Sequence, residues 1–169
     1  MELPKRKSPR IPGYDYSANG AYFITICTHE KKVLFGPVGA DSISARMIKR
    51  TFLETIQKYE NVKSPVFVVM PNHFHAIIQI DRADMESAPT ISQIIQTFKR
   101  YSTVEYIKLV NDKKLPRFDG KVWQRSFHDH VIRDEKGFLE IWNYIEGNPS
   151  KWEEDCFYVK EELDVSIHR

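Results

Sequence analysis

Residues 66–80 read VFVVMPNHFHAIIQI, and they carry the clearest indication of the fold in the sequence. An unbroken apolar run, 66–70, meets a turn dipeptide and is followed by a second run of strand-forming residues, 73–80. Two strands joined by so short a turn form a hairpin, so we expect this part of the sheet to be antiparallel. Because side chains alternate along a strand, His73 and His75 share one face and Phe74 points into the core on the other.

The residues before this hairpin predict one strand and one helix. Residues 21–28, AYFITICT, are rich in β-branched and aromatic side chains, which is typical of a half-buried strand. Residues 42–59 carry apolar side chains at spacings of three to five, which predicts an amphipathic helix with Asp41 or Ser42 as its cap.

The residues after the hairpin predict a helix, a strand and a further helix. A helix begins near Thr90, and residues 122–133, VWQRSFHDHVIR, have strand character. Asp134 then opens a third helix, which stops at Gly147-Asn148-Pro149. The order β-α-β-β-α-β followed by a helix predicts an α+β, ferredoxin-like (split βαβ) fold with an antiparallel sheet, helices packed on one face, and an additional C-terminal helix.

Composition limits the classes of protein that the chain can belong to. Its 169 residues suit one domain (residues 1–169), and 41% hydrophobic residues can build a core. No apolar run approaches the ~20 residues of a membrane span, and no signal peptide is visible. Two cysteines without close spacing argue against a disulfide framework, so we expect a cytoplasmic protein. Charge is uneven: residues 1–12 form a basic arm suited to phosphates or to solvent, and 153–169 form an acidic tail.

Two His-x-His pairs are the strongest candidates for chemistry. Side by side on one strand, His73 and His75 provide half of a metal site, or else they are ordinary polar residues of an amphipathic strand. A second pair, His128 and His130, surrounds a charged residue instead of an apolar one. Spacing alone leaves this second pair as a ligand set, a support for the first pair or a surface feature.

One tyrosine differs from the other seven. At ~100° per residue, Tyr144 lies roughly 110° from the centre of the apolar stripe of its helix, and shares a face with Glu140 and Asn148. A tyrosine in that position can offer its hydroxyl to a reaction, or can be a surface residue with a buried ring edge. Asn148 precedes a proline, so on its own it is a helix terminator.

Three ordered motifs together resemble a known family. The strand PNHFHAII, the segment QRSFHDHVIR and the helix end YIEGNPSKW are similar to the single-tyrosine HUH transposases, and within them to the REP-associated tyrosine transposase group. The opening PGYDYSANGAYFITICTHE resembles that group as well, so the likeness covers about residues 9–152.

The resemblance implies a metal-dependent tyrosine transposase. It implies that Tyr144 is the nucleophile, that His73, His75 and Asn148 hold Mg²⁺ or Mn²⁺, and that single-stranded DNA is cleaved and rejoined through a 5′-phosphotyrosine. His128, His130 and Glu140 are candidates for supporting positions around that site. The DNA is expected to form hairpins, and the protein to act at the bacterial nucleoid as a monomer or a homodimer.

Contacts to DNA would come from cationic and aromatic side chains. The candidates are Lys5, Arg6, Lys7, Arg10, Tyr14, Tyr16, Lys99, Arg100, Arg125 and Arg133. Two other classes of function remain open on the sequence: a ferredoxin-like module that binds nucleic acid without catalysis, and a metal-dependent hydrolase whose nucleophile is water.

Overall fold

The computed structural model describes residues 20–39, 41–81 and 88–160. Within them, four strands form one antiparallel sheet in the order β2-β3-β1-β4; they are β1 (Gly20–Cys27), β2 (Val62–Met70), β3 (His73–Ile80) and β4 (His128–Ile132). The helices are α1 (Ile43–Gln57), α2 (Ile91–Asn111) and α3 (Glu135–Gly147), with short 3-10 segments η1 (His29–Lys31) and η2 (Pro149–Glu154). This is the predicted β-α-β-β-α-β order followed by a helix.

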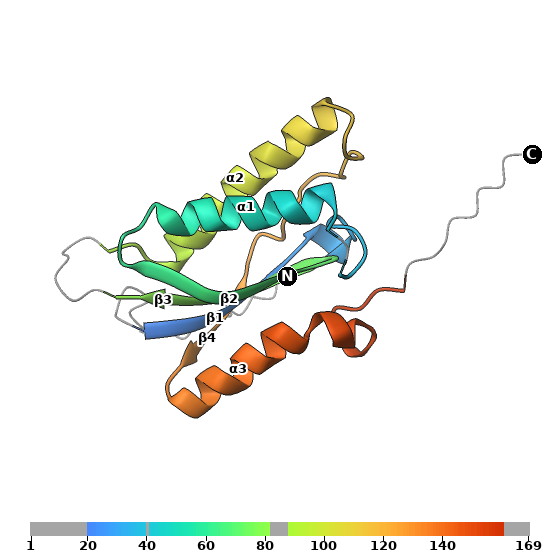
Figure 1. Cartoon of the computed structure of the whole chain (residues 1–169). Helices are drawn as coiled ribbons and strands as arrows, with labels where there is room; N and C mark the ends of the chain where they lie inside the picture. Colours follow the sequence, from blue (N-terminus) through green and yellow to red (C-terminus); the bar gives the residue numbers. More distant parts are fainter. Residues whose placement is uncertain (1–19, 40, 82–87, 161–169) are drawn as a thin grey trace, which may run out of the picture.

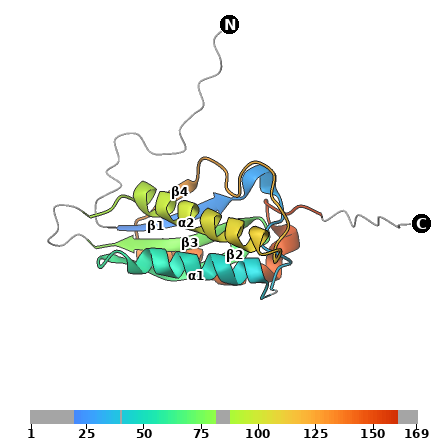
Figure 2. The same cartoon turned by 90° about the horizontal axis from the view of Figure 1, so that it is seen from above.

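The sheet separates two helical layers. α1 and α2 lie side by side over one face, and α3 lies against the opposite face (Figures 1 and 2). Each of the first two helices connects strands that have another strand between them, which is the split βαβ arrangement. The α+β fold is confirmed, and the sheet therefore presents two different faces.

The larger core lies between the sheet and the α1/α2 layer. Phe74 of β3 is fully buried there, and its ring centroid lies 4.7 Å from Phe52 of α1 and 5.1 Å from Phe98 of α2. Since neighbours along a strand point to opposite faces, burying Phe74 on this side directs both flanking histidines toward α3.

Side-chain caps fix the start of each long helix. Ser42 accepts a hydrogen bond from the Ala45 amide, and Asp134 accepts one from the Gly137 amide. Thr90 forms a reciprocal capping box with Gln93. These three starts agree with the sequence patterns, and Ser42 is the cap of α1.

The predicted strand over residues 122–133 is too long. β4 covers only His128–Ile132, and before it a single bridge joins Trp123 to Thr28. The ammonium of Lys99 accounts for part of the difference, because it donates to the carbonyl oxygens of Gln124 (2.8 Å) and Ser126 (3.1 Å), leaving these groups outside any ladder. The pattern resembled a strand because aromatic side chains here are buried for a different reason, namely packing into the core.

Among the described residues, no helix is long and apolar enough to cross a membrane. Six candidate DNA contacts lie outside the described residues: Lys5, Arg6, Lys7, Arg10, Tyr14 and Tyr16.

Candidate functional site

His73 and His75 lie on the same face of β3, at the centre of the sheet, and their side chains are buried. Polar residues on the strand face opposite Phe74 would be expected to project outward into solvent, and this expectation is wrong: His73 is 0% and His75 1% exposed. Aromatic rings cover them, with Phe157 4.7 Å from the His73 ring and Tyr144 5.4 Å from the His75 ring. The sequence pattern assigned the face correctly, but could not reveal that α3 and the segment after it close over that face.

Each imidazole is held at Nδ1 and has no hydrogen-bond partner at Nε2. Nδ1 of His73 lies 2.9 Å from Oδ1 of Asn72, and Nδ1 of His75 lies 2.9 Å from the hydroxyl of Thr25. Both Nε2 atoms are buried without a hydrogen bond. A buried polar atom without a partner is costly, and a pair of them needs an explanation. This is the arrangement of metal-binding histidines, in which a second group orients the ring through its other nitrogen.

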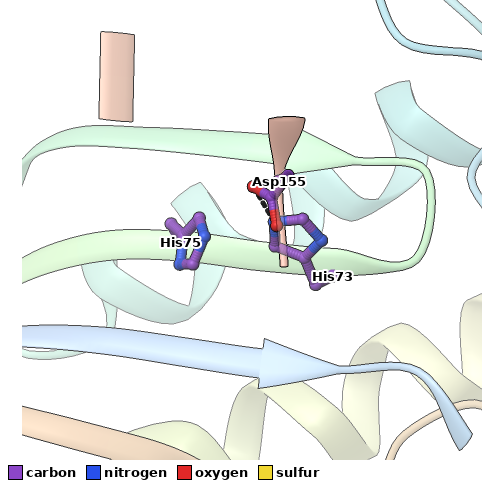
Figure 3. A group of neighbouring side chains, drawn as sticks. All are labelled: His73, His75 and Asp155. Atoms are coloured by element: carbon purple, nitrogen blue, oxygen red, sulfur yellow. Dashed lines mark ion pairs between the residues drawn. The ribbon is translucent and has the colours of Figure 1, made fainter. Parts of the chain in front are cut away.

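A carboxylate completes the cluster. Ligand atoms of His73, His75 and Asp155 all lie within 4.8 Å of one another, and Asp155 Oδ2 is 3.8 Å from His73 Nε2. Figure 3 shows Asp155 beside His73, with His75 next along the strand. The Asp155 carboxylate is itself held in place, since Oδ1 accepts from the Phe157 amide at 2.7 Å. Two imidazole nitrogens and a carboxylate can hold a divalent metal ion.

Asn148 also reaches this cluster. It forms the C-cap of α3, is buried, and donates from Nδ2 to Asp155 Oδ2 at 2.9 Å. Its Oδ1 is buried without a hydrogen-bond partner, like the two histidine Nε2 atoms. The asparagine is thus a helix terminator and a member of the polar cluster at the same time.

Burial sets the protonation state of the two histidines. It lowers the pKa of His73 to about 4, against the opposing effect of the Asp155 carboxylate. Burial, together with the neighbouring His73, lowers the pKa of His75 to about 3. Both rings are therefore neutral near pH 7, the form in which an imidazole nitrogen can coordinate a metal ion.

Tyr144 lies at the edge of this cluster, on α3. Its side chain is 45% exposed, and its ring contacts those of His75 (5.4 Å) and Phe23 (6.0 Å). Burial of its inner edge raises the pKa of the hydroxyl, as does the Asp155 carboxylate, while a hydrogen bond with Asn148 lowers it. A cavity of about 300 Å³ opens here, lined by residues of α3 and of the segment 151–156. The phenol thus faces both solvent and the buried polar cluster.

The remaining candidates lie elsewhere. His128 and His130 are exposed on β4, at the edge of the sheet. Glu140 is exposed on α3 and lies 3.9 Å from Lys136 in an ion pair. The structure does not bring these three into the buried cluster.

The cationic candidates in the described part are spread over separate elements. Lys99 is engaged with backbone carbonyls, as described above. Arg100 is exposed on α2, in the helical layer on the far side of the sheet from α3. Arg125 and Arg133 are exposed in the segments on either side of β4.

Sequence reasoning missed two residues of the site. Asp155 belongs to the predicted acidic tail, but η2 brings it back to the sheet, and it hydrogen-bonds Asn148 seven residues before it. Asn72 belongs to the predicted turn dipeptide, and its side chain also holds His73. Asn72 directly precedes His73, and this position is a signal that could have drawn attention to it, whereas no comparable signal in the sequence marks Asp155.

Comparisons with known proteins agree on one family. The family model described as "Transposase IS200 like" matches residues 18–148. A Haemophilus influenzae protein of uncharacterised function is 33% identical over 91% of this chain and 93% of its own length. A second H. influenzae protein, provisionally named a REP-associated tyrosine transposase, is 26% identical over 81% of this chain and 74% of its own length.

Two solved structures share the fold. A REP-associated tyrosine transposase bound to a REP hairpin superposes with a TM-score of 0.59 at 19% identity, over 84% of this chain and 74% of the other. A Deinococcus radiodurans protein provisionally described as a transposase gives a TM-score of 0.52 at 17% identity, over 82% of this chain and 95% of the other.

Proposed function

Because the chain belongs to the IS200-like transposase family, we propose that it cleaves and rejoins single-stranded DNA through a covalent 5′-phosphotyrosine on Tyr144. Membership of this family indicates a role in transposition, and the arrangement of the site supports cleavage by a tyrosine nucleophile. One observation carries the proposal: beside the partly exposed Tyr144 lie three residues of one cluster, each with a buried ligand atom that has no hydrogen-bond partner. These atoms are Nε2 of His73, Nε2 of His75 and Oδ1 of Asn148.

The proposed metal ligands are these three atoms and the Asp155 carboxylate. Mixed imidazole and oxygen ligation suits Mg²⁺ or Mn²⁺. When bound, such an ion supplies positive charge that polarises the scissile phosphate and stabilises the charge developing on its oxygens. The unpaired atoms fit this role, because a cation satisfies lone pairs that no protein donor reaches.

Tyr144 performs the covalent step in this proposal. Its hydroxyl oxygen loses a proton and attacks the phosphorus, and the bond from phosphorus to the 3′ oxygen breaks. The departing 3′ oxygen gains one proton, so no net proton is released. The product is a 5′-phosphotyrosine and a free 3′-hydroxyl. Attack by a new 3′-hydroxyl reverses the step and releases the tyrosine, so rejoining needs no nucleotide cofactor.

The substrate in this proposal is a single strand that forms a hairpin. A related fold was solved with a REP hairpin bound, which supports this choice. The cavity beside Tyr144 opens between α3 and the segment 151–156, so the strand would approach the hydroxyl from that side. The exposed Arg125 and Arg133 are available for phosphate contacts near β4.

Covalent capture tests the proposal. The protein is incubated with Mn²⁺ and hairpin-forming single-stranded DNA, and the adduct is measured by denaturing gel and mass spectrometry. We expect an adduct that peptide mapping places on Tyr144, and none with Tyr144→Phe, which keeps the ring and loses only the oxygen. Tyr101→Phe is the matched control, because Tyr101 is similarly exposed (40%) but lies on α2, on the other side of the sheet.

Three results would contradict the proposal. An adduct in Tyr144→Phe would move the nucleophile to another residue. Cleavage without an adduct in the unmodified protein would indicate a hydrolase with water as nucleophile. DNA binding without cleavage would indicate a binding module.

A further inference from the structure

We propose that Asn72 is a positioning residue of the metal site, which selects the tautomer of His73 and fastens the segment that carries Asp155. The inference rests on the proposed function in taking the His73–His75 cluster as the metal site. Its evidence is the hydrogen bonding of one fully buried side chain in the turn between β2 and β3.

The orientation of the Asn72 carboxamide is fixed by its neighbours. Nδ2 donates to two carbonyl oxygens, that of Lys31 at 3.1 Å and that of Phe157 at 2.8 Å. A carbonyl oxygen only accepts, so the amide nitrogen must face these two groups. Oδ1 must then face His73, whose Nδ1 lies 2.9 Å away.

This orientation determines which nitrogen of His73 carries the proton. Because Oδ1 is an acceptor only, the hydrogen bond requires a proton on Nδ1 of His73. A neutral imidazole has one ring proton, so Nε2 keeps a free lone pair. Nε2 is the atom that lies 3.8 Å from Asp155 and has no hydrogen-bond partner. Asn72 therefore turns His73 into a ligand that points its lone pair at the cluster.

The same carboxamide holds the segment after α3. The Phe157 carbonyl accepts from Asn72, and the Phe157 amide donates to Asp155 Oδ1 at 2.7 Å. Phe157 thus links Asn72 to the Asp155 carboxylate, and its ring centroid lies 4.7 Å from that of His73, with the two rings tilted. The carboxylate and the imidazole are positioned by the two ends of one amide group.

The third contact of Asn72 lies on a strained stretch of backbone. Glu30 and Lys31 both have positive φ, 55° and 56°, a conformation unfavourable for residues with a side chain. Such strain persists only where the surroundings hold it, and it gathers at functional sites. The Lys31 carbonyl is held by Asn72, and the Lys31 ammonium lies 5.4 Å from the centre of the Phe157 ring.

An asparagine that merely shapes a turn bonds its own neighbouring backbone. Here both amide donors reach residues 41 and 85 positions away in the chain. The side chain therefore joins distant segments of the chain next to His73, and the turn itself does not require these contacts.

Nitrogen-15 NMR of the histidine rings tests the first half of the inference on the unmodified, metal-free protein at pH 8. We expect His73 with its proton on Nδ1 and an unprotonated Nε2. Finding the proton on Nε2 overturns the inference without any substitution.

Two variants test both halves together. Asn72→Leu removes acceptor and donor at similar size; we expect His73 to lose its Nδ1–H preference and the Mn²⁺ affinity, measured by calorimetry, to fall ~10–100-fold. Asn72→Asp keeps an acceptor and loses the donor; we expect the Nδ1–H tautomer to persist while hydrogen exchange at the Phe157 amide speeds up at least ~10-fold, the response of a released segment.

Thr25→Val is the matched control, since it removes the partner of His75 and should leave the His73 tautomer unchanged. A folded Asn72→Leu protein with the original tautomer and Mn²⁺ affinity refutes the inference, as does unchanged Phe157 exchange in Asn72→Asp. If Asn72→Leu does not fold, the tautomer in the unmodified protein and the Phe157 exchange rate in Asn72→Asp still test the inference. These readouts need no DNA, so failure of the adduct assay would refute the proposed function separately.

Discussion

The two His-x-His pairs lie on the same face of the same sheet, but they differ in burial and in the position of their strand. In the strand register His75 pairs with Thr25, and Thr25 pairs on its other side with His128, so all three side chains point toward the same face. β3 is a central strand and β4 an edge strand. The β3 pair is buried, and the β4 pair is exposed.

The cause of this difference is what covers each strand. α3 packs over β2 and β3, and the segment after it closes over His73 through Phe157. That cover shields the β3 pair from solvent and leaves its Nε2 atoms buried without a hydrogen-bond partner. The β4 pair keeps its water. The spacing of two histidines is therefore weak evidence for a site, and their depth in the fold is strong evidence.

The largest expected difference between the pairs is in metal binding. We expect the double variant His73→Ala/His75→Ala to lose more than ~100-fold in Mn²⁺ affinity, since loss of an outer-shell partner alone costs 10–100-fold. His128→Ala/His130→Ala should stay within ~3-fold of the unmodified protein. Calorimetry measures both, and circular dichroism checks folding. Equal losses in the two variants would mean that the β4 pair belongs to the site.

Metal removal gives the next effect. A ligand that binds only the folded state at a free concentration of 100 times its Kd stabilises it by about 2.7 kcal/mol. We expect Mn²⁺ to raise the unfolding temperature of the unmodified protein and of the β4 double variant by an amount that corresponds to this free energy. A chelator should reverse the increase. The β3 double variant should show no response in the same thermal scan. A response there would place the ion elsewhere.

Thr25→Val should have an intermediate effect. The substitution keeps the shape and removes the hydroxyl 2.9 Å from His75 Nδ1, so the ring loses one of the groups that orient it. We expect Mn²⁺ affinity to fall ~10-fold and stability by ~1 kcal/mol, measured by calorimetry and urea unfolding. The hydroxyl would have no role in the site if metal affinity were unchanged.

The smallest effect concerns the stability of the edge strand. His128→Ala should change the free energy of unfolding by less than ~0.5 kcal/mol, as is usual for exposed positions away from special features. His75→Ala should cost more, because it leaves a cavity in a buried site. Urea unfolding of the metal-free proteins compares them, and equal costs would contradict the difference in burial.

Local patterns predicted the parts of the fold that local physics controls. Alternation placed Phe74 and the two histidines on the correct faces, and cap residues such as Ser42 and Asp134 marked helix starts. The predicted strand over residues 122–133 began too early, because the buried aromatic side chains before residue 128 give the same pattern as a strand. The pattern of apolar residues indicates which side chains are buried. It does not indicate which backbone groups are hydrogen-bonded to each other.

The site was predictable only where its residues share an element. His73 and His75 lie on one strand, and Tyr144 and Asn148 lie one turn apart on the same helix face. Asp155 has no such relation to any of them, since the kink at Lys151 within η2 redirects the chain. The burial of the histidines was unpredictable for the same reason, because the covering segment is defined by tertiary packing alone.

The contact between Asn72 and Phe157 also has a consequence for biosynthesis. Ribosomes make the chain from its N-terminus, so all four strands are translated before Asp155 and Phe157. A nascent chain can thus complete its sheet and still lack the carboxylate beside His73 and the carbonyl held by Asn72. Assembly of the His73–His75–Asp155 cluster therefore follows the synthesis of the whole sheet.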